Sequence, residues 1–172
     1  AAQYYRDAKI LTIYEGTTAI QANDLVGRKT ARDGGTVAKA VAKQIEATEA
    51  ELGKRDSVAA RTVAKRLKAA REAFLQVVDF VAGNTKASPN AVFAGSVPYL
   101  MLAGNLVAGW QLGRALLVAE DKAAAGEDVD FMQAKIATAR FYADHILTKV
   151  PGLRDTIVED DDSVSGLALD AF

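Results

Sequence analysis

Glu15 is the residue with the clearest chemical potential in this chain, and it lies in the stretch IYEGTTAIQ at positions 13–21. A carboxylate between an aromatic residue and a glycine, at a bend before a helix, admits two interpretations. Burial against apolar groups disfavours the charged form of a carboxyl group and makes it a stronger base, as general acid–base catalysis requires. Exposure to water makes the same residue part of an ordinary turn between helices.

Other residue types that build active sites are scarce. The chain has no cysteine and a single histidine, His145, so it offers little for a zinc site or a histidine-based triad. We expect His145 to be a bundle or helix-terminus residue. The acidic run at 159–162 lacks the alternating ligands and glycine bend of a calcium loop, which favours a solvated tail. No metal site is predicted.

Composition limits the classes of protein that this chain can be. Half of the 172 residues are hydrophobic and a quarter are charged, enough for one domain, or one domain with a piece of another. The net charge of −1, with no clustered basic face, argues against a nucleic-acid-binding protein. The lack of cysteine and of a signal peptide predicts a cytoplasmic protein. Because the chain starts without methionine and inside a helical pattern, we expect a piece of a longer protein.

The sequence predicts an all-α fold. Prolines number only three, helix-forming residues dominate, and no run alternates strictly as a strand would. Thr18 with Gln21 has the form of a capping box, and Thr36 and Ser57 are predicted to cap later helices. The helix after Ser57 has a core face at helical spacing: Val63, Leu67, Ala70, Phe74, Val77, Val78 and Val81. The predicted helices span approximately 3–10, 17–32, 36–53, 57–84, 89–125 and 128–151.

Asp33-Gly34-Gly35 is the clearest boundary in the chain. We expect residues 1–33 to be a separate helical piece and residues 36–150 to form an antiparallel bundle of about four helices. Residues 151–172 are predicted to be an extended tail that docks through Leu167, Leu169 and Phe172.

Residues 87–113 carry no charge at all. By length they could span a bilayer, but polar residues and scattered glycines interrupt them. Small residues let helices approach closely, which favours a central bundle helix buried on all sides. A membrane span is disfavoured, so we predict no transmembrane segment, and a role at a membrane surface is a lesser alternative.

A longer pattern surrounds Glu15. Two tyrosines and RDAKI at 6–10 precede IYEGT, and Ile20 and Gln21 follow it. This pattern resembles the C-terminal signature of the acyl-CoA dehydrogenases, and its length and order make a chance match improbable.

The resemblance implies roles for four residues. Glu15 would be the base that removes the α-proton of an acyl-CoA thioester as hydride leaves the β-carbon for N5 of FAD, giving trans-2-enoyl-CoA. Its backbone N–H would polarise the thioester carbonyl, and Gly16 would line the substrate site. Thr17 and Thr18 would contact FAD at a helix start, where free N–H groups favour anions. The electrons would pass to an electron-transfer flavoprotein.

A second resemblance covers the residues from Thr36 onward. With FYADHIL at 141–147, IVED at 157–160 and a Leu-Ala-Leu close, they look like the extra helical domain of larger, very-long-chain-like members. It implies that residues 1–33 are the last helices of the catalytic bundle and that the enzyme, which would serve fatty-acid β-oxidation, is a homodimer. This piece alone would lack most of the FAD site and be inactive.

A different class of function stays open. The chain would then be a non-catalytic helical module for interaction or oligomerisation, with the uncharged stretch 87–113 joining subunits or a membrane surface. Upstream segments that complete an FAD site would distinguish the enzyme from the module.

Overall fold

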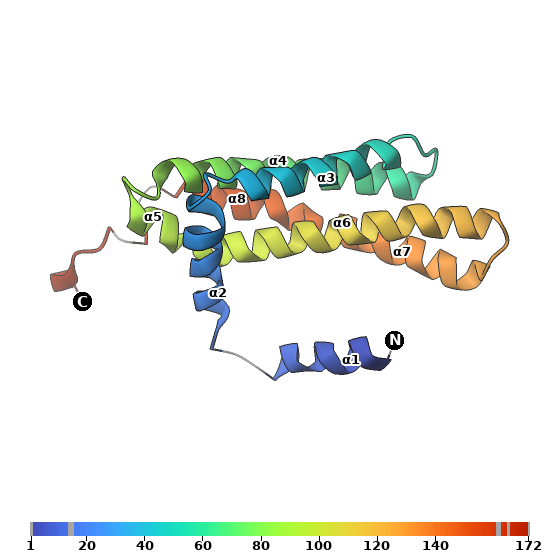
Figure 1. The fold of residues 1–172 in the computed structure, drawn as a ribbon, viewed down its shortest axis with the longest axis horizontal. Coiled ribbons are helices and arrows are strands. Elements are labelled where there is room, and N and C mark those ends of the chain that lie inside the picture. The colour runs from blue at the N-terminus through green and yellow to red at the C-terminus, as the bar shows by residue number, and fades with distance from the viewer. Residues whose placement is uncertain (1, 14–15, 161–162, 165, 172) are drawn as a thin grey trace.

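The computed structural model describes residues 2–13, 16–160, 163–164 and 166–171, and within these ranges helices joined by turns and short loops are present, without a strand. Four long helices form an antiparallel bundle in which successive helices run in opposite directions (Figure 1). They are α3 (Thr36–Leu52), α4 (Val58–Asn84), α6 (Ser96–Ala124) and α7 (Val129–His145). The predicted all-α fold and antiparallel bundle are therefore confirmed.

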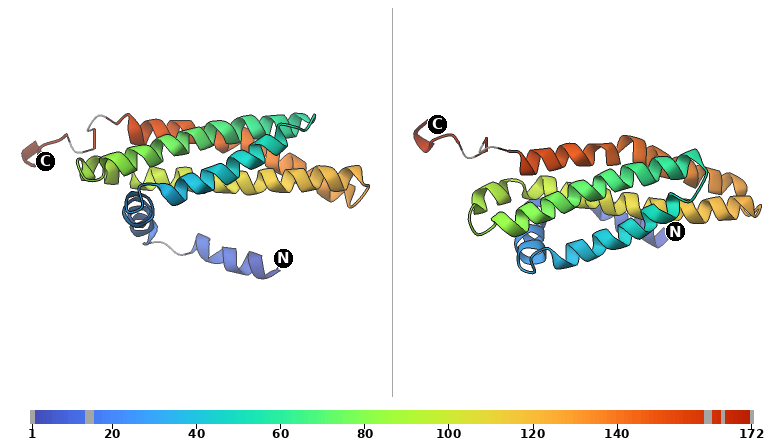
Figure 2. Two further views of the ribbon diagram at one scale, coloured as in Figure 1. Left: turned by 45° about the horizontal axis from the view of Figure 1, so that its top comes forward. Right: turned by 90° about the horizontal axis from the view of Figure 1, so that it is seen from above.

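The shorter helices surround this bundle. The helix α5 (Pro89–Ala94) connects α4 to α6, and α8 (Val150–Val158) continues beyond α7 and packs on α4 and α6. At the N-terminal side, α1 (Ala2–Lys9) is followed by α2 (Thr18–Asp24), which continues into a π-helical segment, Leu25–Ala31. Helix α2 crosses one end of the bundle, whereas α1 lies to one side of it (Figures 1 and 2). Short 3-10 turns cover Ile10–Thr12, Leu147–Lys149 and Leu169–Ala171.

Helix α4 is the centre of the core, because it packs against α3, α6, α7 and α8. All seven residues predicted for its core face are buried. Its start is also as predicted, since the Ser57 hydroxyl accepts a hydrogen bond from the Ala60 N–H at 2.9 Å. A regular amphipathic pattern and a side-chain cap thus define this helix locally.

The uncharged stretch 87–113 is not one helix buried on all sides, and that prediction is wrong. Gly95 separates α5 from α6, and a Cβ atom added there would lie 2.9 Å from Cγ2 of Ile157 on α8. One side of α6 packs on its neighbours, while the other exposes four large apolar side chains: Val97, Met101, Val107 and Val118. A helix at the corner of a bundle contacts neighbours over only part of its circumference. In the described part of the chain, no helix has both the length and the apolar character that crossing a membrane requires.

The C-terminal tail begins later than predicted. Helix α7 ends at His145, and α8 then starts at Val150, with Pro151 in its first turn. Proline is tolerated there because its missing N–H would have no partner within the helix. Residues 151–158 are thus helical and not extended. Leu167 is exposed and does not dock, while the Leu169 side chain and Phe172 lie outside the described residues.

Two predicted helix caps are also wrong. The cap residue of α2 is Thr17, which makes no side-chain capping bond, so the capping box predicted at Thr18 does not form. Helix α3 is preceded by Gly35 at φ +80°. The side chain at the start of this helix is that of Asp33 and not Thr36. The Asp33 carboxylate accepts hydrogen bonds from the N–H groups of Gly35 and Val37, each at 3.0 Å. An aspartate side chain competes well for such N–H groups.

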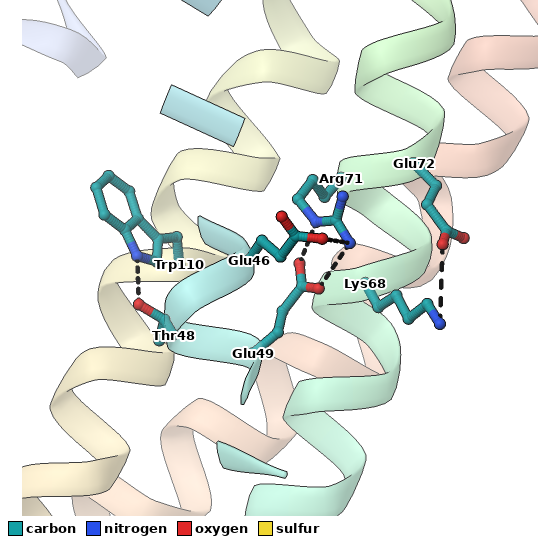
Figure 3. Close-up of polar contacts among 7 residues, drawn as sticks. All are labelled: Glu46, Thr48, Glu49, Lys68, Arg71, Glu72 and Trp110. Carbon is teal, nitrogen blue, oxygen red and sulfur yellow. Dashed lines mark hydrogen bonds and ion pairs between the residues drawn. The ribbon is translucent and has the colours of Figure 1, made fainter. Parts of the chain in front are cut away.

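One ion pair is buried between α3 and α4. Arg71 donates from Nε and Nη2 to the Glu49 carboxylate at 2.8 and 3.0 Å, and Glu46 lies 3.5 Å from Nη2 (Figure 3). Arg71 is 8 % exposed and Glu49 9 %. The hydrogen bonds that Arg71 donates to Glu49 raise the pKa of Arg71, outweighing the effect of burial. The neighbouring pair of Lys68 and Glu72, at 3.9 Å, is exposed.

Candidate functional site

The segment predicted to carry the chemistry lies between α1 and α2. Tyr14 and Glu15, the predicted base, lie outside the described residues. The predicted break between the two helices is confirmed, because the 3-10 turn ends at Thr12 and α2 starts at Thr18. Gly16 is exposed and has a φ of +112°, which L side chains rarely adopt. An added Cβ would meet no described heavy atom within 4 Å, so within the described chain the positive φ, and not a close neighbour, favours glycine.

Thr17 and Thr18 are both half-buried at the start of α2. The Gln21 N–H donates to the Thr17 carbonyl at 2.8 Å and begins the helical ladder. The first N–H groups of a helix have no partner within it, and the Thr17 side chain supplies none here. Because the π-helical segment continues α2 as far as Ala31, these groups stand at the positive end of a long helix.

One face of this helix anchors it on the bundle. Ala22, Val26 and Thr30 recur at intervals of four residues and are at most 1 % exposed. The Thr30 hydroxyl lies 2.9 Å from the Tyr99 hydroxyl of α6, and both are buried. Burial raises the pKa of Tyr99, partly offset by this hydrogen bond. This pair could not be predicted from the sequence, because its members are far apart in the chain and both resemble ordinary packing residues.

The segment before α2 has an apolar surface that no part of the described chain covers. Every residue from Ala2 to Ile13 is exposed. Up to residue 20, the large apolar side chains exposed are Tyr4, Tyr5, Ile10, Leu11, Ile13 and Ile20. The bundle has surface hollows of its own, one between α3, α6 and α7, one along α7, and one between α3 and α4. Residues 16–18 do not line any of these three.

His145 occupies the position expected of a structural residue. It is the last residue of α7, is exposed, and has its ring 4.5 Å from the ring of Phe141. Among the described residues, no group of acidic or histidine side chains is arranged to hold a metal ion.

Comparison with known proteins identifies the family. Residues 37–168, which include the whole bundle apart from the first residue of α3, match the family model described as "Acetyl-CoA dehydrogenase C-terminal like". The chain belongs to the acyl-CoA dehydrogenase family. The acyl-CoA dehydrogenase resemblance read from the sequence is therefore confirmed.

Three curated relatives extend this match. A 3-methylmercaptopropionyl-CoA dehydrogenase of Ruegeria pomeroyi is 52 % identical over 95 % of this chain and 28 % of its own length. A broad-specificity linear acyl-CoA dehydrogenase of Mycobacterium tuberculosis is 35 % identical over 99 % of the chain and 29 % of its length. A butyryl-CoA dehydrogenase of Syntrophomonas wolfei is 32 % identical over 91 % of the chain and 25 % of its length. The chain thus spans less than a third of each relative, and the first two matches include residues 13–21.

Proposed function

We propose that this chain is the C-terminal part of an FAD-dependent acyl-CoA dehydrogenase that oxidises acyl-CoA to trans-2-enoyl-CoA in fatty-acid β-oxidation. The whole enzyme would be a cytoplasmic homodimer that passes its electrons to an electron-transfer flavoprotein. The main support is that relatives named as acyl-CoA dehydrogenases match the chain through residues 13–21. A left-handed bend at Gly16, directly before a helix, is compatible with a side chain presented to a cleft.

Glu15 is the proposed base. An α-proton of a thioester is only weakly acidic, so the carboxylate must be more basic than one in water, which burial beside substrate would achieve. Gly16 leaves room for the thioester to approach the backbone, where the N–H of Glu15 would stabilise the developing enolate oxygen. The acyl pocket that sets chain-length preference would be formed by the rest of the enzyme.

Thr17 and Thr18 are the proposed FAD contacts. Both residues are half-buried, and the N–H groups at this helix start have no side-chain cap from Thr17. Such a helix end suits the phosphate groups of a dinucleotide, so the described residues fit the cofactor. When bound, FAD supplies the acceptor for the two electrons of the oxidation.

The exposed apolar surface before α2 supports the assignment of residues 1–33 to the catalytic domain of the whole enzyme. Burial of one large apolar side chain contributes about 1.5–3 kcal/mol. Five such side chains before α2, and Ile20 in its first turn, are exposed in this chain, and the remainder of the enzyme would cover them. On this proposal the isolated chain cannot oxidise acyl-CoA. Dye reduction by the isolated chain with acyl-CoA would contradict that expectation.

Glu15→Gln in the full-length enzyme tests the proposal. Loss of a positioned general base is expected to lower turnover by about 10²–10⁴-fold, while the flavin absorbance of the purified protein stays unchanged. Glu72→Gln is the matched control, because it removes an exposed carboxylate on α4. Unchanged turnover of the Glu15 variant would favour the non-catalytic helical module.

A further inference from the structure

A groove runs along the outer face of α6 at the bundle end opposite to α2. Its walls are the C-terminal half of α3 and the first turns of α7, and its volume is about 990 Å³. Small-molecule sites have volumes of about 300–1,000 Å³. The helix α2, which follows the proposed catalytic segment, crosses the other end of the bundle, and residues 16–18 do not line the groove, so the two are separate (Figure 1).

The groove is positively charged, although the whole chain has a net charge of −1. Five cationic and two carboxylate side chains line it. Arg55 and Asp121 neutralise each other through hydrogen bonds of 2.5 and 3.1 Å, and Lys122 binds Glu127 outside the groove at 2.6 Å. The three remaining cations of the lining are Lys54, Arg114 and Lys135. Within the described chain, none of the three has a carboxylate at ion-pair distance.

Two of these cations lie over aromatic rings. The Arg114 guanidinium lies 5.7 Å from the centre of the Trp110 ring, and its Nη1 donates to Gln111 at 2.9 Å. The Lys135 ammonium lies 5.0 Å from the centre of the Phe131 ring. The indole N–H of Trp110 in turn donates to the Thr48 hydroxyl at 2.8 Å (Figure 3). Cations ordered in advance lose less side-chain entropy when they bind a ligand.

We propose that this groove binds a phosphorylated small molecule. Its phosphate would lie among Lys54, Arg114 and Lys135, and an apolar or aromatic portion would pack on Phe131 and Met132. With one unpaired glutamate in the lining, the remaining excess of two positive charges matches a phosphate dianion. A guanidinium group also presents paired N–H donors that fit phosphate oxygens. This inference is independent of the proposed catalytic function.

Trp110 provides the assay, because it is the single tryptophan of the chain. Its fluorescence is followed at low ionic strength while the chain is titrated with ADP, coenzyme A, inorganic phosphate or adenosine. ADP and coenzyme A are expected to give saturable changes, whereas adenosine, which has no phosphate, gives none. If inorganic phosphate binds as tightly as ADP, the natural ligand of the groove is free phosphate. Added salt is expected to weaken binding.

A pair of double variants separates the groove from general charge. Lys54→Gln with Lys135→Gln is expected to weaken ADP binding by at least about tenfold, since each lysine would supply a charge-assisted contact. Lys43→Gln with Lys65→Gln removes two exposed lysines of α3 and α4 outside the groove and should leave binding unchanged. Circular dichroism checks that both double variants are folded. If a double variant is unfolded, its two single lysine variants are measured instead. The proposal is overturned if the ADP titration does not saturate, or if both double variants bind ADP equally well. It is also overturned if the chain binds poly-glutamate but does not bind ADP.

Discussion

Replacing Arg71 by methionine tests how much the buried ion pair contributes to stability. Methionine retains much of the apolar stem but removes the charge, so the Glu49 carboxylate, 9 % exposed, loses both hydrogen bonds. Removal of one partner from a buried pair costs about 3–5 kcal/mol. Because both side chains keep slight access to water, we expect a value near the lower limit, about 3 kcal/mol.

The measurement is reversible thermal or urea unfolding of the chain. For a chain of this size, a loss of about 3 kcal/mol lowers Tm by about 6–12 °C. Adding Glu49→Leu should recover most of the loss, because apolar replacement of both partners is often close to neutral. Lys68→Met is the control, since its pair with Glu72 is long and exposed and should contribute less than about 0.5 kcal/mol. Equal shifts for Arg71→Met and Lys68→Met would refute the argument from burial.

Two further predictions concern α6. Gly109→Ala should destabilise the chain by about 1–3 kcal/mol, because the added Cβ would lie 2.6 Å from Cδ2 of Leu147. Gly104→Ala, where the added Cβ meets nothing, should stabilise it by up to about 1 kcal/mol; urea unfolding compares the two. Burial raises the pKa of Tyr99 above 10.0. The contribution of the protonated Tyr99 hydroxyl to folding stability is therefore complete at lower pH and is lost as the pH rises through the folded-state pKa. As the pH rises above 10, the Tyr99→Phe variant should therefore lose less stability than the wild type. At neutral pH the variant should be less stable by about 1 kcal/mol, because the Thr30 hydroxyl loses its partner. Urea unfolding at both pH values measures the two effects.

The parts of the fold that follow from local pattern could be predicted from the sequence. The core face of α4 is an example, because a regular apolar spacing leaves one arrangement that buries it. The exposed face of α6 could not be predicted, since valine and methionine are tolerated on surfaces and an uncharged helix looks the same whether enclosed or at a corner. The prediction that Pro151 ends the last helix failed for a similar reason, because proline is common both after the end of a helix and in its first turn.

The candidate site divides in the same way. Residues 15–18 form one continuous motif and could be found from the sequence, although Glu15 lies outside the described residues and its role stays a prediction. The cations of the α6 groove come from the turn after α3, from α6 and from α7, and only folding brings Lys54, Arg114 and Lys135 to one surface. No sequence window contains all three.

The helix from Thr18 to Ala31 connects the predicted site to the bundle. Its first residues belong to the site motif, and one of its faces is packed on the bundle. It is about 20 Å long, so a tilt of about 3° at the anchored end moves the other end by about 1 Å. A displacement of that size can cost an enzyme about a hundredfold in rate. If Glu15 has the proposed role, the buried contacts of Ala22, Val26 and Thr30 help determine where it is presented. The bundle would then act on catalysis through the orientation of this helix and not through direct contact with substrate.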